Sequence, residues 1–418
     1  MLKKTVLPNN IRIISEYMQE AYSSTIMVWL DAGSGLESME LNGISHFIEH
    51  MLFKGTKCRS PKQIVEAIEN TGGSINAFTD RESTCCYAKV LSSHVTVAVD
   101  ILLDMVLNSL YDEKDVKLEK QVILEEIKMY EDTPDELVYD LLLKSFLGEH
   151  PLGQSVIGTA ESIFRISKKD ILDFVNDFYT SDNIVISIAG NFNEEAVLSQ
   201  INDTIGHIKT CAKSKKTETP VISPKISVIN KKIEQSHICL GTRGISILDK
   251  DRYALDIIDV CLGGSMGSRL FQEVREKRGL AYSINTYAAL YRPCGIFGVY
   301  LSANPANVKE VINLTLKEIE KFRLTGLSDE EIQKAKNQIK GNMFIGLEST
   351  KHRACRNAMS ELYFNKVLTI EEISARIDEI TQDDIIRLSN YIFDNKYMGI
   401  ALVGPKESGL AIKQEFVL

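Results

Sequence analysis

The sequence has no excess of basic residues. Lysine and arginine total 48, aspartate and glutamate total 57, and the formal net charge is −9. Nucleic acids and anionic membrane surfaces are recognised mainly by basic surfaces. We therefore expect neither nucleic acid nor a membrane as a partner, whereas a net acidic chain suits cationic ligands.

Long apolar runs and CxxC cysteine pairs are also missing. No apolar run approaches the roughly 18 residues of a membrane span, and the N-terminus MLKKTVLPNN lacks the apolar core of a secretory signal. The eight cysteines show no CxxC spacing. In a chain of this size they are typical of free thiols in a reducing compartment, not of a disulfide framework. We expect a cytoplasmic protein.

An internal repeat is the first positive feature of the chain. Its 418 residues suffice for two to four domains at about 100–200 residues per domain. Four segments of the first half return in the same order in the second half, 209 to 216 residues later. The pairs are SINAFT from Ser74 and SINTYA from Ser283, YDEKDVKLEKQVI and LSDEEIQKAKNQI, SKKDILDFVNDFY and TQDDIIRLSNYIF, and VISIAGN and GIALVGP. Four ordered matches indicate duplication.

The predicted fold class is α+β, with two homologous domains that each contain a mixed or antiparallel sheet covered by helices. Alternating strand patterns such as TIMVWLDAG and STCCYAKVL are interspersed with long amphipathic helices. The polar, aperiodic segment around CAKSKKTETP is the natural linker. We predict domains at 1–206 and 225–418, joined by a linker at 207–224.

The segment GISHFIEHMLFKGT carries the strongest functional signal. We expect a helix that stops near Gly55, with His46 and His50 one turn apart so that both imidazoles reach one ion. Glu49 projects beside that ion. The order H-x-x-E-H is the inverzincin motif. Two neutral imidazoles bind zinc, and a carboxylate beside the open position takes a proton from the bound water.

This motif is rare by chance. With seven histidines and 57 acidic residues among 418, about 0.016 such motifs are expected in a chain of this composition. Two surface or capping histidines on an ordinary helix are the competing interpretation.

A catalytic zinc needs a third protein ligand. We expect one long helix over residues 116–140, in which Glu119 and Glu126 are two turns apart and share a face. Glu125 points about 100° away and is the weaker candidate. A solvated acidic face is the alternative, and the spacing alone does not decide between them.

HFIEHMLFKGT, SINAFTDRE and the E-x6-E helix together resemble the pitrilysin-type inverzincin peptidases, above all the catalytic (beta) subunit of the mitochondrial processing peptidase and its bacterial relatives. The resemblance covers nearly the whole chain. In that family a glutamate 76 positions after the second histidine completes the zinc set, which here implies Glu126 and one zinc ion per chain. It also implies that Glu119 supports the site from behind the ligands.

The resemblance implies a second catalytic element in the C-terminal half. Arg275 and Tyr282 match the family's arginine and tyrosine that stabilise the transition state. A guanidinium and a phenol can donate hydrogen bonds to the oxyanion that forms during amide hydrolysis. An ordinary helix end with a packed tyrosine is the competing interpretation.

Substrate-binding residues are also implied. The strand containing Asn76, Ala77 and Phe78 matches the family's edge strand, to which an unfolded peptide can add by backbone hydrogen bonds. Phe53 matches an aromatic residue of the pocket after the scissile bond. An interior strand and a plain core residue are the alternatives.

Glu136 and Asp140 lie one helical turn apart and match an acidic pair that receives an arginine before the cleavage site. Paired carboxylates are good partners for a guanidinium. A solvated helix face is equally compatible with the spacing.

These features predict a zinc-dependent metalloendopeptidase that forms half of a clamshell and cleaves unfolded or presequence-like peptides with basic residues near the cut. A closed chamber in this family needs four homologous domains, so the resemblance implies a homodimer, or a heterodimer with a partner lacking the motif. The alternative function is a catalytically inactive or peptide-binding subunit of the same fold, which the intact motif disfavours.

Overall fold

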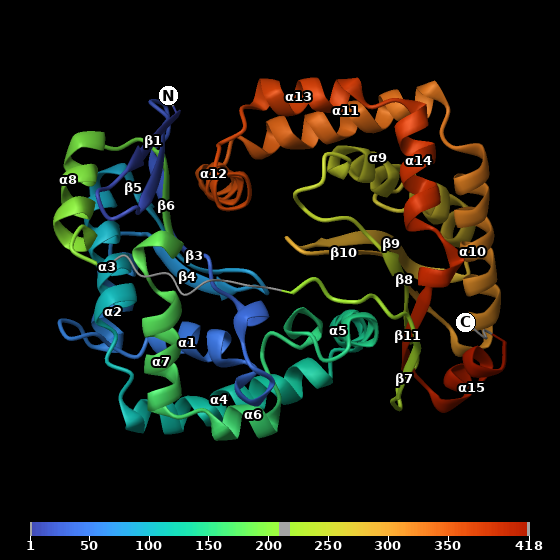
Figure 1. Cartoon of the computed structure of the whole chain (residues 1–418), viewed down its shortest axis with the longest axis horizontal. Coiled ribbons are helices and arrows are strands. Elements are labelled where there is room, and N and C mark those ends of the chain that lie inside the picture. Colours follow the sequence, from blue (N-terminus) through green and yellow to red (C-terminus); the bar gives the residue numbers. More distant parts are fainter. Residues whose placement is uncertain (1, 209–217, 416–418) are drawn as a thin grey trace. The chain divides into compact units, whose positions relative to one another are not determined.

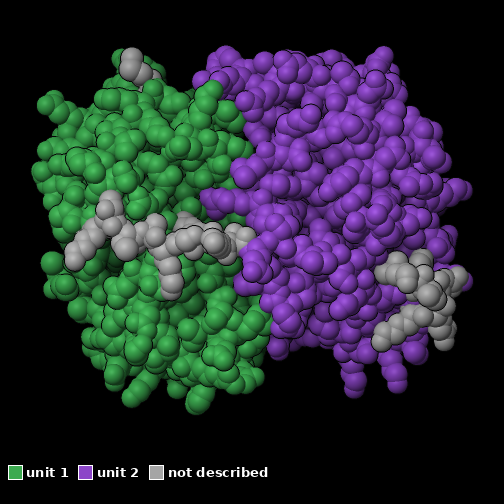
Figure 2. All heavy atoms as spheres, viewed as in Figure 1, with its two compact units in different colours: residues 1–128, 154–217, 344–368 green, residues 129–153, 218–343, 369–418 purple. Residues whose placement is uncertain are grey.

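The computed structural model describes residues 2–208 and 218–415 (Figure 1). Residues 209–217, the centre of the predicted linker at 207–224, lie outside the described residues. The chain forms two compact units, coloured separately in Figure 2. Unit 1 contains residues 1–128, 154–217 and 344–368, and unit 2 contains residues 129–153, 218–343 and 369–418.

Unit 1 is built on a six-stranded sheet with the order β1-β2-β6-β3-β5-β4. Strands β2 and β6 are parallel and all other neighbours are antiparallel, so the sheet is mixed. Strand β4 forms one edge. The strands are β1 (Leu2–Val6), β2 (Arg12–Tyr17), β3 (Ser23–Leu30), β4 (Ser74–Thr79), β5 (Thr84–Leu91) and β6 (Ile184–Gly190).

The helices of unit 1 form three groups around this sheet. Helices α3 and α8 pack on one sheet face through a large apolar core, and α12 covers the opposite face. Helices α1, α4 and α7 share a separate apolar cluster. The helices are α1 (Ile44–Leu52), α2 (Pro61–Glu69), α3 (Val95–Asn108), α4 (Glu113–Glu131), α6 (Ala160–Arg165), α7 (Lys168–Phe178), α8 (Glu194–Ile205) and α12 (Thr350–Phe364).

Unit 2 contains a five-stranded sheet with the order β7-β11-β8-β10-β9, in which only β7 and β11 are parallel. Its strands are β7 (Ile226–Asn230), β8 (Ser236–Arg243), β9 (Ala281–Leu290), β10 (Gly295–Ala303) and β11 (Gly399–Gly404). Its helices are α5 (Pro134–Leu147), α9 (Arg252–Leu262), α10 (Val308–Thr325), α11 (Asp329–Gly346), α13 (Ile370–Glu379), α14 (Gln382–Ile392) and α15 (Lys406–Glu415).

The two sheets confirm the predicted α+β duplication. The order β7-β11-β8-β10-β9 repeats β2-β6-β3-β5-β4, including the single parallel pair. Each matched sequence pair occupies corresponding elements: SINAFT and SINTYA lie in β4 and β9, and the other pairs lie in α4 and α11, α7 and α14, and β6 and β11.

Two helices are exchanged between the halves, so the compact units do not follow the predicted division at the linker. Helix α5 belongs to the first half of the sequence but packs on β11 and β8 of unit 2, where Leu142 and Phe146 are fully buried. Helix α12 belongs to the second half but packs on β3 and β6 of unit 1, where Ala354 and Ala358 share an apolar cluster with Trp29. Each sheet has two apolar faces, and the exchanged helix covers the second one.

The predicted continuous helix over residues 116–140 is wrong. Helix α4 ends at Glu131, and α5 begins at Pro134. Proline is compatible with the first turn of a helix but not with its interior, because it has no backbone N–H and its ring clashes with the preceding turn. None of the described helices combines the length and apolar composition that crossing a bilayer requires.

Candidate metal centre

Helix α1 presents the H-x-x-E-H residues on one side because its apolar residues are buried on the other. Ile44, Phe47 and Ile48 are inaccessible to solvent and pack in the cluster shared with α4 and α7. His46 and His50 therefore project to the opposite side, with ring centroids 4.6 Å apart. The expected helix ends earlier than Gly55, at Leu52.

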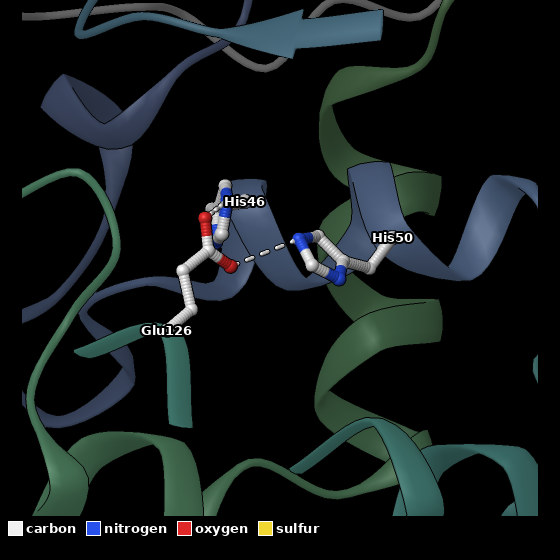
Figure 3. A group of neighbouring side chains, drawn as sticks. All are labelled: His46, His50 and Glu126. Carbon is white, nitrogen blue, oxygen red and sulfur yellow. Dashed lines mark ion pairs between the residues drawn. The ribbon is translucent and has the colours of Figure 1, made fainter. Parts of the chain in front are cut away.

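The structure brings His46, His50 and Glu126 together. One nitrogen from each imidazole and one oxygen of Glu126 all lie within 4.8 Å of one another. Nε2 of His46 is 3.7 Å from Oε1 of Glu126, and Nε2 of His50 is 3.4 Å from Oε2. Figure 3 shows both imidazoles on one helix and the carboxylate reaching them from another.

This arrangement fits a zinc ion. Two imidazole nitrogens and a carboxylate are a typical donor set for a catalytic zinc. Ligand bonds of about 2.0–2.2 Å in tetrahedral geometry place neighbouring ligand atoms about 3.3–3.5 Å apart. The separations of 3.4 and 3.7 Å are close to this spacing and are longer than a good hydrogen bond of about 2.7–3.2 Å.

The other acidic residues of α4 take different positions. Glu119 is 2% exposed and lies behind His50, with Oε1 2.9 Å from Nδ1 of that histidine. Its second oxygen lies 2.5 Å from Nζ of Lys54. The side chain of Glu125 is 74% exposed and forms an ion pair with Lys128. The solvated-face interpretation therefore describes Glu125 but neither Glu119 nor Glu126.

The two histidines have opposite electrostatic environments. Burial, and then the neighbouring His50, lowers the pKa of His46 to about 4. Burial also acts to lower the pKa of His50, but the carboxylates of Glu119 and Glu126 outweigh it and raise this pKa to about 9.

Glu49 is held beside this cluster by strand β4. The hydroxyl of Thr79, the last residue of β4, donates a hydrogen bond of 2.6 Å to Oε2 of Glu49. Burial raises the pKa of Glu49, although this hydrogen bond and His50 oppose the shift. Glu49 also interacts electrostatically with His50 and Glu126 of the cluster.

Arg275 and Tyr282 lie together in unit 2, whereas the cluster of His46, His50 and Glu126 lies in unit 1. Cζ of Arg275 is 5.4 Å from the centroid of the Tyr282 ring. Tyr282 is 72% exposed at the start of the edge strand β9, so it is not the packed core tyrosine of the competing interpretation.

The predicted edge strand is confirmed as an edge, since β4 pairs with β5 on one side and no other described strand pairs with it. Asn76 is exposed, and its side-chain oxygen accepts a 2.8 Å hydrogen bond from the N–H of Ala77. Phe78 packs edge-on against Trp29 at 5.3 Å. Phe53 lies directly after α1 and packs partly buried against the core.

Glu136 and Asp140 lie on α5, within unit 2. Glu136 is exposed and Asp140 is half-buried. The predicted one-turn spacing is present, but the break before Pro134 separates these carboxylates from the helix that carries Glu126.

Sequence reasoning missed three contacts around the site. Lys54 contacts Glu119, and Thr79 donates a hydrogen bond to Glu49. The buried Glu37 accepts a hydrogen bond from the N–H of Ser45 at the start of α1. Lys54 and Thr79 stand within the motifs FKGT and SINAFT, but their partners lie 65 and 30 residues away. Only the tertiary structure identifies these pairs.

The sequence of this chain matches known protein families and relatives. The family model described as "Insulinase (Peptidase family M16)" matches residues 12–160, and the one described as "Peptidase M16 inactive domain" matches residues 165–339. An uncharacterized zinc protease of Bacillus subtilis is 38% identical over 406 residues, covering 97% of this chain and 98% of the relative. One of Streptomyces coelicolor is 36% identical, covering 97% of this chain and 90% of the relative.

Solved structures share the fold of the whole chain. A protease from Helicobacter pylori has a TM-score of 0.88 at 21% identity and covers 97% of this chain and 99% of its own. A structure from Pseudomonas fluorescens titled as a peptidase M16 inactive domain has a TM-score of 0.90 at 20% identity, with coverage of 97% and 98%. Family models match both halves of the chain, and the relatives are 36–38% identical over 97% of it. The H-x-x-E-H helix agrees with this assignment. The chain belongs to peptidase family M16.

Proposed function

We propose that this protein is a zinc-dependent endopeptidase. The observation that carries the proposal is the cluster of His46, His50 and Glu126 around a space that fits one ion, with Glu49 held beside it. The names of the full-length relatives as zinc proteases support the same metal and reaction.

His46, His50 and Glu126 would hold the zinc ion. When bound, zinc supplies a Lewis acid that lowers the pKa of water and polarises the scissile carbonyl. Glu49 accepts the proton of the attacking water and donates it to the leaving amine. Thr79 orients Glu49 for this transfer, because its hydroxyl occupies one carboxylate oxygen and leaves the other free.

Arg275 and Tyr282 would donate hydrogen bonds to the developing oxyanion. Their exposure and mutual contact support this role, since neither side chain is buried in the core of unit 2. We propose, by resemblance to the family, that two copies assemble and that the partner copy supplies this pair. A heterodimer with a partner lacking the motif is the alternative.

The proposed substrates are unfolded or presequence-like peptides with basic residues near the cut. The open edge of β4 beside α1 supports this class, because backbone hydrogen bonds at a sheet edge recognise extended chains with little sequence demand. A bound peptide would replace the Asn76 oxygen on the N–H of Ala77. Phe53 and Phe78 would contact its side chains, and Glu136 with Asp140 would bind an arginine.

Metal analysis and turnover of a quenched peptide library, with and without chelator, test this function. We expect about one zinc ion per chain, and cleavage that chelator abolishes and zinc restores. Glu49→Gln should keep the metal but lose about three orders of magnitude in kcat, because the ligands survive while the proton acceptor does not. Peptide binding without turnover in the zinc-loaded wild type would instead favour the inactive, peptide-binding alternative.

A further inference from the structure

The helix that carries the metal-binding histidines has no cap of its own. Its N-cap residue is Gly43, in the left-handed region with φ 93°, and no cap side chain bonds to the first turn. A side chain would not fit there, because a Cβ atom on Gly43 would lie 2.8 Å from the carbonyl oxygen of Ile157. The first N–H groups of the helix need acceptors from elsewhere.

Glu37 supplies these acceptors from the preceding loop. Its Oε1 accepts a 2.8 Å hydrogen bond from the N–H of Ser45, and its Oε2 accepts a 2.7 Å bond from the N–H of Gly43. The side chain of Asn42 donates a third bond of 3.1 Å. Glu37 is only 5% exposed. A carboxylate at this end of a helix is favoured by the helix dipole.

The loop that carries Glu37 is attached to the hairpin turn after β4. The N–H groups of Ser34 and Gly35 donate hydrogen bonds of 3.2 and 2.6 Å to the carbonyls of Asp80 and Arg81. The two backbones touch, since a Cβ atom on Gly33 would lie 2.2 Å from the Asp80 oxygen. This turn directly follows Thr79, whose hydroxyl holds Glu49.

We propose that Glu37 is a positioning residue that fixes the start of α1 relative to β4. Its two oxygens hold the start of the helix bearing His46 and Glu49 to the loop of residues 33–37. The backbone of this loop is hydrogen-bonded to the turn that follows Thr79. Through this connection Glu37 sets the direction of the imidazoles toward Glu126 and the distance between Glu49 and Thr79. The inference rests on the proposed zinc peptidase function and adds a residue that touches neither metal nor substrate.

Glu37→Gln tests the proposal with Co²⁺ as the probe. The amide keeps the volume but replaces one acceptor oxygen by a donor that faces an N–H group. Apo protein is titrated with Co²⁺ at about pH 8 for every variant, so that competition between the ion and the ligand protons is the same throughout, and both the dissociation constant and the visible absorption spectrum are recorded. We expect Co²⁺ to bind about 10- to 100-fold more weakly, as for other residues that orient ligands, with a changed spectrum.

Glu16→Gln is the matched control. Glu16 is also a buried glutamate of unit 1, at 8% exposure, but it accepts hydrogen bonds from Arg353 and Asn357 of α12. This control should lower Tm without changing Co²⁺ affinity or spectrum. In the zinc-loaded enzyme, Glu37→Gln should lower kcat while KM stays within about twofold, because the proposed peptide-binding edge is intact.

Asn42→Ala is a milder second variant, because it leaves both backbone hydrogen bonds of Glu37 in place. This variant should also weaken Co²⁺ binding, by several-fold. It tests the proposal even if Glu37→Gln does not fold. Wild-type Co²⁺ affinity and spectrum in the variants would overturn the positioning role. Failure of the wild-type protein to bind Co²⁺ would instead overturn the proposed zinc site itself.

Discussion

Nδ1 of His50 lies 2.9 Å from the carboxylate of Glu119, while Nε2 of the same ring faces Glu126. Glu119 is almost fully buried and also contacts Lys54. The carboxylate accepts the Nδ1 proton in the arrangement that the hydrogen bonds favour, which leaves the Nε2 lone pair for a metal. Burial acts to raise the pKa of Glu119, but the hydrogen bond with His50 and the contact with Lys54 outweigh it and lower this pKa.

Glu119→Gln should therefore weaken zinc binding without removing a ligand. The amide can still accept from His50 through its oxygen, but its NH2 group then faces the Lys54 ammonium. We expect a loss of about 10- to 100-fold in zinc affinity, measured by competition with a chromophoric chelator. Zinc affinity equal to that of the wild type would show that Glu119 is merely structural.

Glu126→Gln should release the metal, because a carboxylate ligand becomes a weak neutral one. The matched control is Glu125→Gln, one residue earlier on the same helix, which changes an exposed ion pair with Lys128 only. Metal content of the purified variants distinguishes them. Full zinc occupancy in Glu126→Gln would transfer the ligand role to another residue.

Combined Glu136→Gln and Asp140→Asn substitutions should selectively slow cleavage of arginine-containing peptides. Losing a charge-assisted contact typically costs about 1.5–3 kcal/mol, or roughly tenfold to more than a hundredfold in kcat/KM. Cleavage of matched neutral peptides is the internal comparison. An equal loss for both peptide sets would assign the pair a structural role.

Mixing two inactive variants should restore activity if the site is completed by a partner copy. Glu49→Gln and Tyr282→Phe each disable one element, and a mixed dimer has one site in which both are intact. With random exchange about half of the dimers are mixed, so recovery should approach about a quarter of wild-type activity. No rescue despite demonstrated subunit exchange would place Tyr282 in cis or outside the mechanism.

Glu37 should make the stability of the metal-free protein depend on pH. Burial raises the pKa of Glu37 to about 7, although hydrogen bonds from Ser45, Gly43 and Asn42 oppose the shift. The usual pKa of a glutamate side chain is 4.5, so between these two pH values the folded chain binds more protons than the unfolded chain. The free energy of unfolding of the protein therefore falls, by about 3 kcal/mol in total, as the pH rises from 4.5 to about 7.

Urea unfolding of chelator-treated protein at several pH values checks this dependence. The glutamine of Glu37→Gln stays neutral at every pH. The free energy of unfolding of the wild type should therefore fall, relative to that of this variant, as the pH rises. Parallel stability profiles for the two proteins would contradict the raised pKa.

Features that depend on local spacing were predictable from the sequence. The i, i+4 interval of His46 and His50 places both imidazoles on one side of any helix. The apolar positions between them are buried in the expected direction. The ordered repeat of four segments likewise predicted two sheets with the same strand order, because each half has the same sequence of elements. The predicted helix over residues 116–140 overlooked the break before Pro134, although proline disrupts a helix interior by local sterics.

The choice between Glu119, Glu125 and Glu126 depended on the tertiary structure. Glu119 and Glu126 share a helix face, so spacing alone leaves both open. Packing of Ile123 and Ile127 of α4 into the cluster that contains Phe47 of α1 places Glu126 against Nε2 of His50 and Glu119 against Nδ1. Such a contact joins residues about 70 positions apart, and no local rule specifies it.

The exchange of α5 and α12 and the anchor at Glu37 were likewise decided by the tertiary structure alone. Amphipathic periodicity shows that a helix has an apolar side, but not which of two homologous sheets that side will cover. An isolated glutamate in a loop has the same appearance whether it is solvated or buried against a helix N-terminus. Burial and hydrogen bonding of Glu37 arise only once α1, the loop that precedes it and the turn after β4 are packed together.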